Sequence, residues 1–177
     1  MDQDRTTTLG FARQRGFTVI ELMVSLAVAA ILIGLAVPAF NNFVAQENLL
    51  AQSNDFMVAV QYARSEAVRR GAAMSVRAVN PGDNANEWGP GYCVVVGTPA
   101  NCPGDTTQLR TFAALDGSTL DAQGGLDGLG ILTFNSRGLL VGAAGTLNLC
   151  RAGQTNGRTI SISTIGRVSA QTKTDCP

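Results

Sequence analysis

The sequence contains no histidine. Without an imidazole, the chain cannot form the histidine-dependent catalytic triads or the histidine metal sites that many enzymes use. Charged residues are also few: they make up 15% of the 177 residues, and 13 Lys and Arg balance 13 Asp and Glu. The net charge therefore indicates no particular partner, whereas a hydrophobic content of 45% is too high for a disordered chain.

Cysteine pairs of the C-x-x-C type are missing too. The four cysteines lie at positions 93, 102, 150 and 176, which argues against a zinc ribbon or a thioredoxin-type site. An even number of cysteines outside the apolar N-terminal run suggests disulfides, and hence an oxidising compartment. Of the three possible connectivities, we favour the pairing of sequence neighbours, Cys93–Cys102 and Cys150–Cys176. Buried free thiols are the alternative.

Other patterns of catalysis or ligand binding are equally scarce. Ser25 and Ser65 have no histidine to activate them, and the glycine-rich segment 124–130 lacks the lysine and the strand–turn–helix context of a phosphate-binding loop. The same segment contains Asp and Gly and is a candidate for calcium, but it lacks the regular acidic spacing of an EF-hand. We therefore predict that the chain is not an enzyme and holds no metal or cofactor.

A long apolar run follows a basic N-terminal segment. Residues 17–37 contain no charge except Glu21. At about 1.5 Å per residue, a helix over this run would span roughly 30 Å, the thickness of a bilayer's hydrocarbon core. Arg13 and Arg15 precede the run, so the positive-inside rule places residues 1–15 in the cytoplasm. A secretory signal peptide has a shorter apolar region, and a plain single-pass anchor leaves Glu21 unexplained.

The start of the apolar run carries a known signature. Gly16-Phe17-Thr18-Val19-Ile20-Glu21-Leu22 resembles the GFTLIEL signature of type IV prepilins and type II secretion pseudopilins. The resemblance implies that a prepilin peptidase cuts the chain after Gly16 and methylates the new amino terminus at Phe17. The apolar segment would then stay on the mature protein.

The same resemblance gives Glu21 a role in filament assembly. A carboxylate at membrane depth costs on the order of a few kcal/mol unless it is paired. In the resembling proteins, the matching glutamate helps a subunit to dock into the growing filament. The implied partner is the positively charged amino terminus of a neighbouring subunit, or alternatively that of the same subunit. An incidental charge at the bilayer surface is the simpler alternative.

The helical pattern continues beyond the apolar run. Pro38 removes a backbone donor within the helix, and Gly34 precedes it by one turn, so we expect a kink there. Residues 41–70 read as an amphipathic helix that ends at Arg69-Arg70-Gly71. Its charged residues, Glu66 among them, are expected to be mostly available to water. The apolar face that should dock on a sheet consists of Leu49, Phe56, Val60, Ala63 and Ala67.

From residue 72 onward the pattern is that of β-strands. Short β-like runs are separated by clusters of Gly, Pro, Asn and Asp, as expected for an antiparallel β domain. Segment 116–130 is rich in Gly and Asp, and we expect it to be an exposed, mobile loop. The fold class is therefore α+β, and the order of elements resembles the type IV pilin fold. The predicted strands are Met74–Val79, Tyr92–Val96, Gln108–Leu115, Ile131–Phe134, Thr146–Cys150 and Thr159–Ile165.

Three further segments narrow the resemblance. Residues 61–67, QYARSEA, are similar to a segment typical of the GspH/FimT group of minor pilins and pseudopilins. Residues 132–138, LTFNSRG, resemble a strand and turn of that group, and residues 160–168, ISISTIGRV, resemble its closing strand pair. The resemblance implies a minor pilin in the priming or tip complex of a type IV pilus, with other pilins as partners. A minor pseudopilin of a type II secretion system is the alternative.

The charge distribution raises a second alternative, which is DNA binding during natural transformation. Residues 81–136 carry six acidic residues and one basic residue, whereas residues 137–177 carry five basic residues and one acidic residue. Some FimT-type pilins bind DNA through a carboxy-terminal G-R-x-R motif. Here the two matching stretches, Gly166-Arg167-Val168-Ser169 and Gly157-Arg158-Thr159-Ile160, lack the second arginine. A solvated basic face or a contact with a neighbouring subunit is therefore the competing explanation. The candidate DNA-binding residues are Arg151, Arg158, Arg167 and Lys173.

These observations predict an organisation in four parts. Residues 1–16 form a cytoplasmic leader that is removed, and residues 17–40 form the transmembrane and assembly half of the helix. Residues 41–71 form its amphipathic half, and residues 72–177 form a periplasmic β-rich domain. The predicted location is the inner membrane, spanned once, and then the filament.

Overall fold

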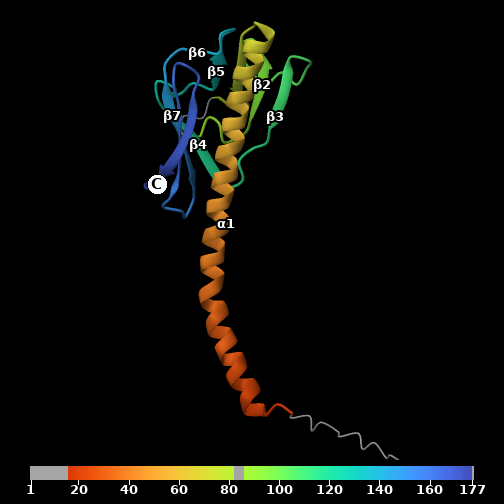
Figure 1. Cartoon of the computed structure of the whole chain (residues 1–177), viewed down its shortest axis with the longest axis vertical. Coiled ribbons are helices and arrows are strands. Elements are labelled where there is room, and N and C mark those ends of the chain that lie inside the picture. The colour runs from red at the N-terminus through yellow and green to blue at the C-terminus, as the bar shows by residue number, and fades with distance from the viewer. Residues whose placement is uncertain (1–15, 82–85, 177) are drawn as a thin grey trace, which may run out of the picture. The chain divides into compact units, whose positions relative to one another are not determined.

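The computed structural model describes residues 16–81 and 86–176. The predicted leader therefore lies outside the described residues, except for Gly16. The chain divides into two compact units, one ending at Phe40 and one beginning at Asn41. One helix, α1 (Val19–Arg70), contributes to both units (Figure 1).

In the first unit, α1 exposes its apolar side chains. Thr18 caps the start of the helix, because its Oγ1 accepts a hydrogen bond from the backbone N–H of Glu21 at 3.3 Å. By length and composition, this part of α1 is apolar enough to cross a membrane. The helix includes Gly34 and Pro38 without interruption, and the kink expected there stays a prediction.

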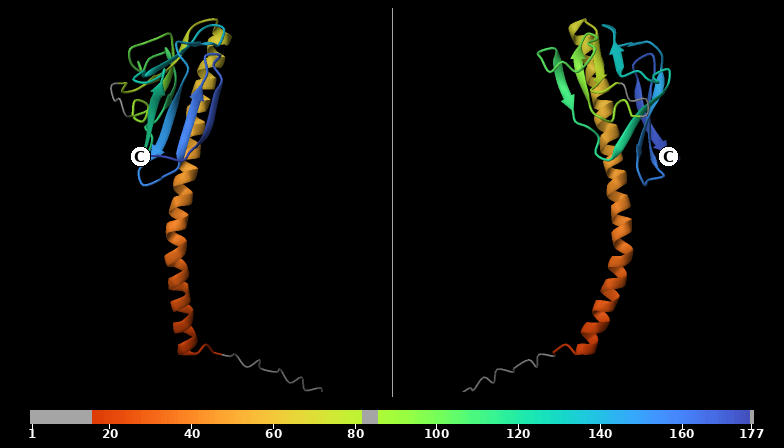
Figure 2. Two further views of the ribbon diagram at one scale, coloured as in Figure 1. Left: turned by 90° about the vertical axis from the view of Figure 1, so that its left-hand side faces the viewer. Right: turned by 180° about the vertical axis from the view of Figure 1, so that it is seen from behind.

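In the second unit, α1 packs against the β-strands through the face expected from the sequence. Figure 2 shows the strands on one side of this half of the helix. All five residues of the predicted face are completely buried: Leu49, Phe56, Val60, Ala63 and Ala67. This confirms the amphipathic pattern. The expectation that Glu66 faces water is wrong, since that residue is 6% exposed.

Two antiparallel sheets make up the rest of this unit. The first has the strand order β3-β2-β1-β5-β6 and the second has the order β4-β7-β8-β9. The strands are β1 (Met74–Ala78), β2 (Tyr92–Val96), β3 (Gln108–Phe112), β4 (Ser118–Gly124), β5 (Ile131–Phe134), β6 (Leu140–Val141), β7 (Gly145–Arg151), β8 (Gly157–Ile162) and β9 (Val168–Lys173). A long helix on antiparallel sheets is the predicted α+β fold class, which is thereby confirmed.

The expectation of a loop over residues 116–130 is wrong. Strand β4 occupies Ser118–Gly124 and pairs with β7 along its whole length. Ser118, Leu120 and Ala122 alternate toward the interior, and Leu126 beyond the strand is 3% exposed. Only one of the three inward residues is large and apolar, so the alternation was too weak to outweigh the glycines and aspartates around it.

Buried Glu87 fastens this segment to the rest of the domain. Its carboxylate accepts hydrogen bonds from the backbone N–H groups of Ala122 at 3.1 Å and Gly128 at 3.3 Å. Glu87 is completely buried. Its two oxygens thus satisfy one donor within β4 and one beyond it, where a missing acceptor would be costly.

The core beside this segment is aromatic, and two disulfides link strands of the same unit to other segments. The ring of Phe56 on α1 meets Trp88 and Tyr92 edge-on, with centroid distances of 5.4 and 5.1 Å. The structure contains the disulfides Cys93–Cys102 and Cys150–Cys176. These are the neighbour pairs favoured from the sequence, and they join β2 to the loop after it and β7 to the C-terminal segment.

Replacement of Glu87 by Ala should lower the free energy of unfolding by about 1–3 kcal/mol, because the buried N–H of Ala122 and the part-buried N–H of Gly128 would each lose an acceptor. Chemical denaturation of the variant measures this loss. Glu47→Ala is the control, since Glu47 is exposed on α1 and its loss should cost less than about 0.5 kcal/mol. Equal stability of the two variants would show that the carboxylate does not hold the segment.

Candidate functional site

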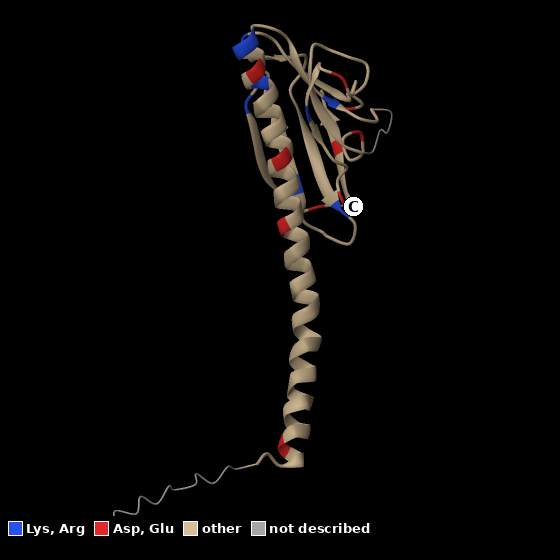
Figure 3. Cartoon of the chain, turned by 90° about the vertical axis from the view of Figure 1, so that its right-hand side faces the viewer, with Lys and Arg blue, Asp and Glu red and all other residues tan. Residues whose placement is uncertain are grey.

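The start of α1 is the first candidate site. Thr18-Val19-Ile20-Glu21 has the spacing of a capping box, in which a glutamate at the third helical position supports the helix start. Glu21 is exposed, as are the apolar side chains that follow it. It is also the single charged residue between positions 16 and 40, and Figure 3 shows the long uncharged stretch of helix that follows. Any cationic side chain that pairs with Glu21 must therefore come from outside this range.

A second candidate site forms where the three family-like segments meet. Arg64 projects from α1, Gly138 ends the turn between β5 and β6, and Gly166 ends the turn between β8 and β9. The Nε of Arg64 donates a hydrogen bond to the carbonyl oxygen of Gly138 at 2.9 Å. Segments 61–67, 132–138 and 160–168 are thus brought together around one guanidinium.

Both glycines are needed for this close approach. Gly138 and Gly166 have φ values of 75° and 74°, a backbone region that favours glycine. A Cβ on Gly166 would lie 2.5 Å from the carbonyl oxygen of Gly138 and 2.9 Å from the Nε of Arg64. A Cβ on Gly138 would lie 2.9 Å from the Cγ2 of Val68. The turns therefore close on α1 only if both positions lack a side chain.

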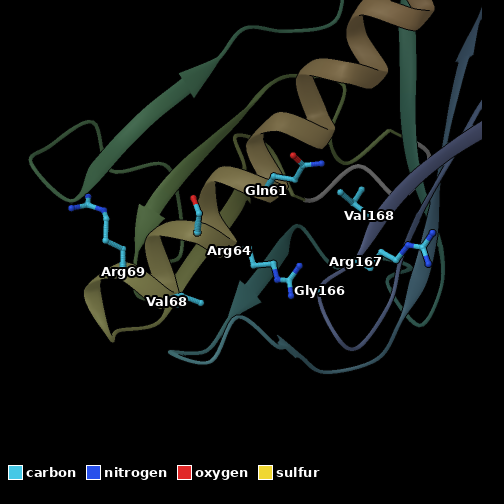
Figure 4. A pocket seen from close by; sticks show the side chains of 8 residues that line it. Gln61, Arg64, Val68, Arg69, Gly166, Arg167 and Val168 are labelled. Carbon is cyan, nitrogen blue, oxygen red and sulfur yellow. The ribbon is translucent and has the colours of Figure 1, made fainter.

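An open groove of about 610 Å³ lies beside this contact. We call it the arginine groove. Figure 4 shows Arg64 next to Gly166, with the side chain of Arg167 extending away from the helix. The groove is lined by Gln61, Arg64, Ser65, Val68, Arg69, Gly166, Arg167 and Val168. It combines three cations with apolar surface, and no carboxylate is among the residues that line it.

Glu66 lies next to the groove and partly neutralises it. The Nε of Arg69 donates to one of its oxygens at 2.9 Å, and the Nε of Arg70 donates to the other at 2.7 Å. These hydrogen bonds, that from Arg69 first and then that from Arg70, hold the pKa of Glu66 below its usual value. The pairing also explains why Glu66 is shielded from water, and it leaves Arg64 and Arg167 as the unpaired cations of the groove.

The structure does not bring the four candidate DNA-binding residues together. Only Arg167 lines the arginine groove. Arg158 pairs with Thr172, which is five residues from Arg167 and hence about 16 Å along β9. Arg151 donates to the carbonyl oxygen of Asp116 at 3.0 Å, and the Nζ of Lys173 lies 4.0 Å from an oxygen of Asp175.

Sequence reasoning missed Arg64 and Arg69 as site residues. The sequence did contain a signal for Arg64, because this residue lies in one of the three segments that resemble the GspH/FimT group. What the sequence did not show is that these segments surround a single side chain. Their long separations along the chain leave that proximity to the tertiary fold.

Replacement of Gly166 by Ala should destabilise the domain by about 1–3 kcal/mol more than replacement of Gly153 by Ala. Both glycines have positive φ values, 74° and 77°, so both variants carry the same backbone strain. Only the Cβ at position 166 would meet other atoms, since nothing lies within 4 Å of one at position 153. Thermal or chemical unfolding measures the difference. Equal losses of stability in the two variants would mean that the two turns do not pack closely against Arg64.

Comparison with known proteins agrees with this architecture. A family described as Type II transport protein GspH matches residues 52–166, and a prokaryotic N-terminal methylation motif matches residues 11–37. The long apolar helix and the antiparallel β domain define a type IV pilin-like protein. The chain belongs to the GspH family, which confirms the resemblance seen in the sequence.

Solved structures show the same fold. Two crystal structures of the type IV minor pilin FimU from Pseudomonas aeruginosa strain PAO1 are 26% identical to this chain. They cover 72% and 76% of it and 99% of their own chains, with TM-scores of 0.57 and 0.60. The minor pseudopilin EpsH from Vibrio cholerae shares the fold at 13% identity and a TM-score of 0.51, over 72% of this chain and 97% of its own. No curated protein sequence matches the chain significantly.

Proposed function

We propose that this protein is a minor pilin that is incorporated into a type IV pilus, in the priming or tip complex. One observation carries the proposal: a GspH-family β domain follows a helix whose methylation motif contains a lone, exposed glutamate among exposed apolar side chains. Exposed apolar surface of this extent needs cover from lipid or from neighbouring helices. The proposal gives the chain a structural role and no reaction of its own.

The proposal includes a maturation step in the inner membrane. Prepilin peptidase would cut after Gly16 and methylate the amino group of Phe17. The leader, residues 1–16, would stay in the cytoplasm, residues 17–40 would anchor the precursor, and the part from residue 41 onward would lie in the periplasm. The two disulfides support this location, because disulfides persist in the oxidising periplasm.

Glu21 would direct entry into the filament. In a low-dielectric environment, a carboxylate attracts a nearby ammonium group much more strongly than it does in water. Residues 16–40 offer no cationic side chain, so the proposed partner is the amino terminus of Phe17 in a neighbouring subunit. Desolvation of the carboxylate would then be compensated only after assembly.

Glu21→Gln removes this charge while keeping a residue type that suits the third position of a helix. A glutamine at the same position of a capping box still supports the helix, but it cannot attract an ammonium group. We expect at least a tenfold loss of the protein from sheared pili, with normal amounts in the membrane, measured by immunoblotting. Glu47→Ala should leave both amounts unchanged. Full incorporation of the glutamine variant would contradict the proposed charge pairing.

A pseudopilin of a type II secretion system is the alternative function. The name of the matching family points to type II transport, whereas the 26% identity to FimU over nearly all of the FimU chain favours the pilus. DNA binding gains no support from the arrangement of the four candidate residues, and it is not proposed as a second function.

Deletion of the gene in its host should distinguish the two kinds of filament. We expect a loss of surface pili and of twitching, with enzyme secretion into the medium unchanged, because a priming subunit is needed only by its own filament. Electron microscopy counts the pili, and activity assays on the culture medium measure secretion. Loss of secretion with normal pili would establish the pseudopilin alternative.

A further inference from the structure

We propose that the arginine groove binds a carboxylate-bearing peptide segment of a neighbouring pilin subunit. This inference rests on the proposed function, since the partner is another subunit of the filament. The groove lies within the unit that begins at Asn41. It is therefore separate from the helix start and from the charge pairing of Glu21.

Arg64 is oriented to receive an anion. The backbone carbonyl of Gly138 accepts only its Nε–H, at 2.9 Å, and Gly166 packs against the same side chain. Within residues 16–81 and 86–176, neither terminal nitrogen of Arg64 has a hydrogen-bond partner. A guanidinium held in this way presents its remaining N–H groups in a fixed direction, which suits the two oxygens of a carboxylate.

Arg167 supplies the second cation from the turn between β8 and β9. Its backbone is held by Ser163, whose Oγ accepts the N–H of Arg167 at 3.1 Å and whose N–H donates to the carbonyl of Arg167 at 3.0 Å. The side chain itself is exposed. Arg64 is thus pre-positioned, whereas Arg167 is free to close over a bound segment.

The apolar part of the groove favours a peptide over a nucleic acid. Val68 is 55% exposed at the groove, and Ile165, in the turn just before Gly166, is 59% exposed. A peptide with both acidic and apolar side chains would satisfy the cations and also cover these surfaces. Single-stranded nucleic acid is usually bound on aromatic side chains, none of which lines this groove. Duplex binding usually requires many phosphate contacts, whereas Arg167 alone of the four candidate DNA-binding residues lines the groove.

The chain itself shows that a subunit of this family can present such a segment. Asp105 and Asp116 are exposed in the acidic part of the chain, residues 81–136. A volume of about 610 Å³ accommodates a few residues. Charge complementarity between an acidic loop of one subunit and the arginine groove of the next would fix their relative orientation.

Fluorescence anisotropy with the full-length protein in detergent micelles tests the proposal. The probes are two labelled octapeptides, one of alternating Glu and Ala and one of alternating Gln and Ala, and a single-stranded and a duplex oligonucleotide. At about 150 mM salt, we expect the Glu peptide to bind at least tenfold more tightly than the Gln peptide and than either oligonucleotide. Equal binding of the two peptides, or tighter binding of an oligonucleotide, would overturn the proposal.

Two arginine variants locate the binding. Arg167→Gln alters an exposed side chain, so the fold should be unaffected, and we expect about a tenfold weaker affinity for the Glu peptide. Arg110→Gln removes another exposed arginine, from β3, in the other sheet, and should leave the affinity unchanged. Equal effects of the two substitutions would refute the groove as the site. The assay requires no filament, so a failure here, with Glu21→Gln still excluded from pili, would overturn the groove proposal alone.

Discussion

Burial of one face of the second half of α1 is the constraint on which the domain depends. The sequence predicted five residues of that face. Three of them are large or β-branched, and the other two are alanines, Ala63 and Ala67. The alanines lie near the end of the helix, where small side chains let the neighbouring backbone approach closely. Arg64 and Val68 lie beside them and meet the two glycine turns. The packing of the helix thus also determines where the arginine groove forms.

The helix start and the arginine groove share one electrostatic property. Within the residues that the structure describes, each presents a group without an ionic partner: a lone carboxylate among apolar side chains at Glu21, and an oriented guanidinium at Arg64. Two buried carboxylates of the described domain are held differently. Glu66 is paired with two arginines, and Glu87 accepts two backbone donors. A charge that is held in a fixed orientation without an ionic partner, as at Arg64, is a better sign of a binding role than an exposed charge alone.

The sequence predicted correctly those structural features that depend on a single side chain or on a local periodicity of apolar residues. The helical face from Leu49 to Ala67, strands β2 and β5, and the four-cysteine pattern all depend on local spacing. Strand β4 was missed because its inward positions are mostly small or polar, so its identity as a strand comes from pairing with β7. The convergence of residues 64, 138 and 166 was equally invisible, because it depends on how two turns from different sheets close on the helix.

The difference between spacing along the sequence and packing in the fold explains why the candidate DNA-binding residues were chosen and why they lie apart in the structure. Their selection used charge along the sequence, in which Arg158 and Arg167 are near neighbours. A β-hairpin sends such neighbours to opposite ends of its strands, so Arg158 moves away from Arg167. The same hairpin brings Arg167 to the groove that Arg64 also lines, more than a hundred residues earlier in the chain. A cationic site in this domain is therefore defined by the turn that presents it to α1 and not by a run of basic residues.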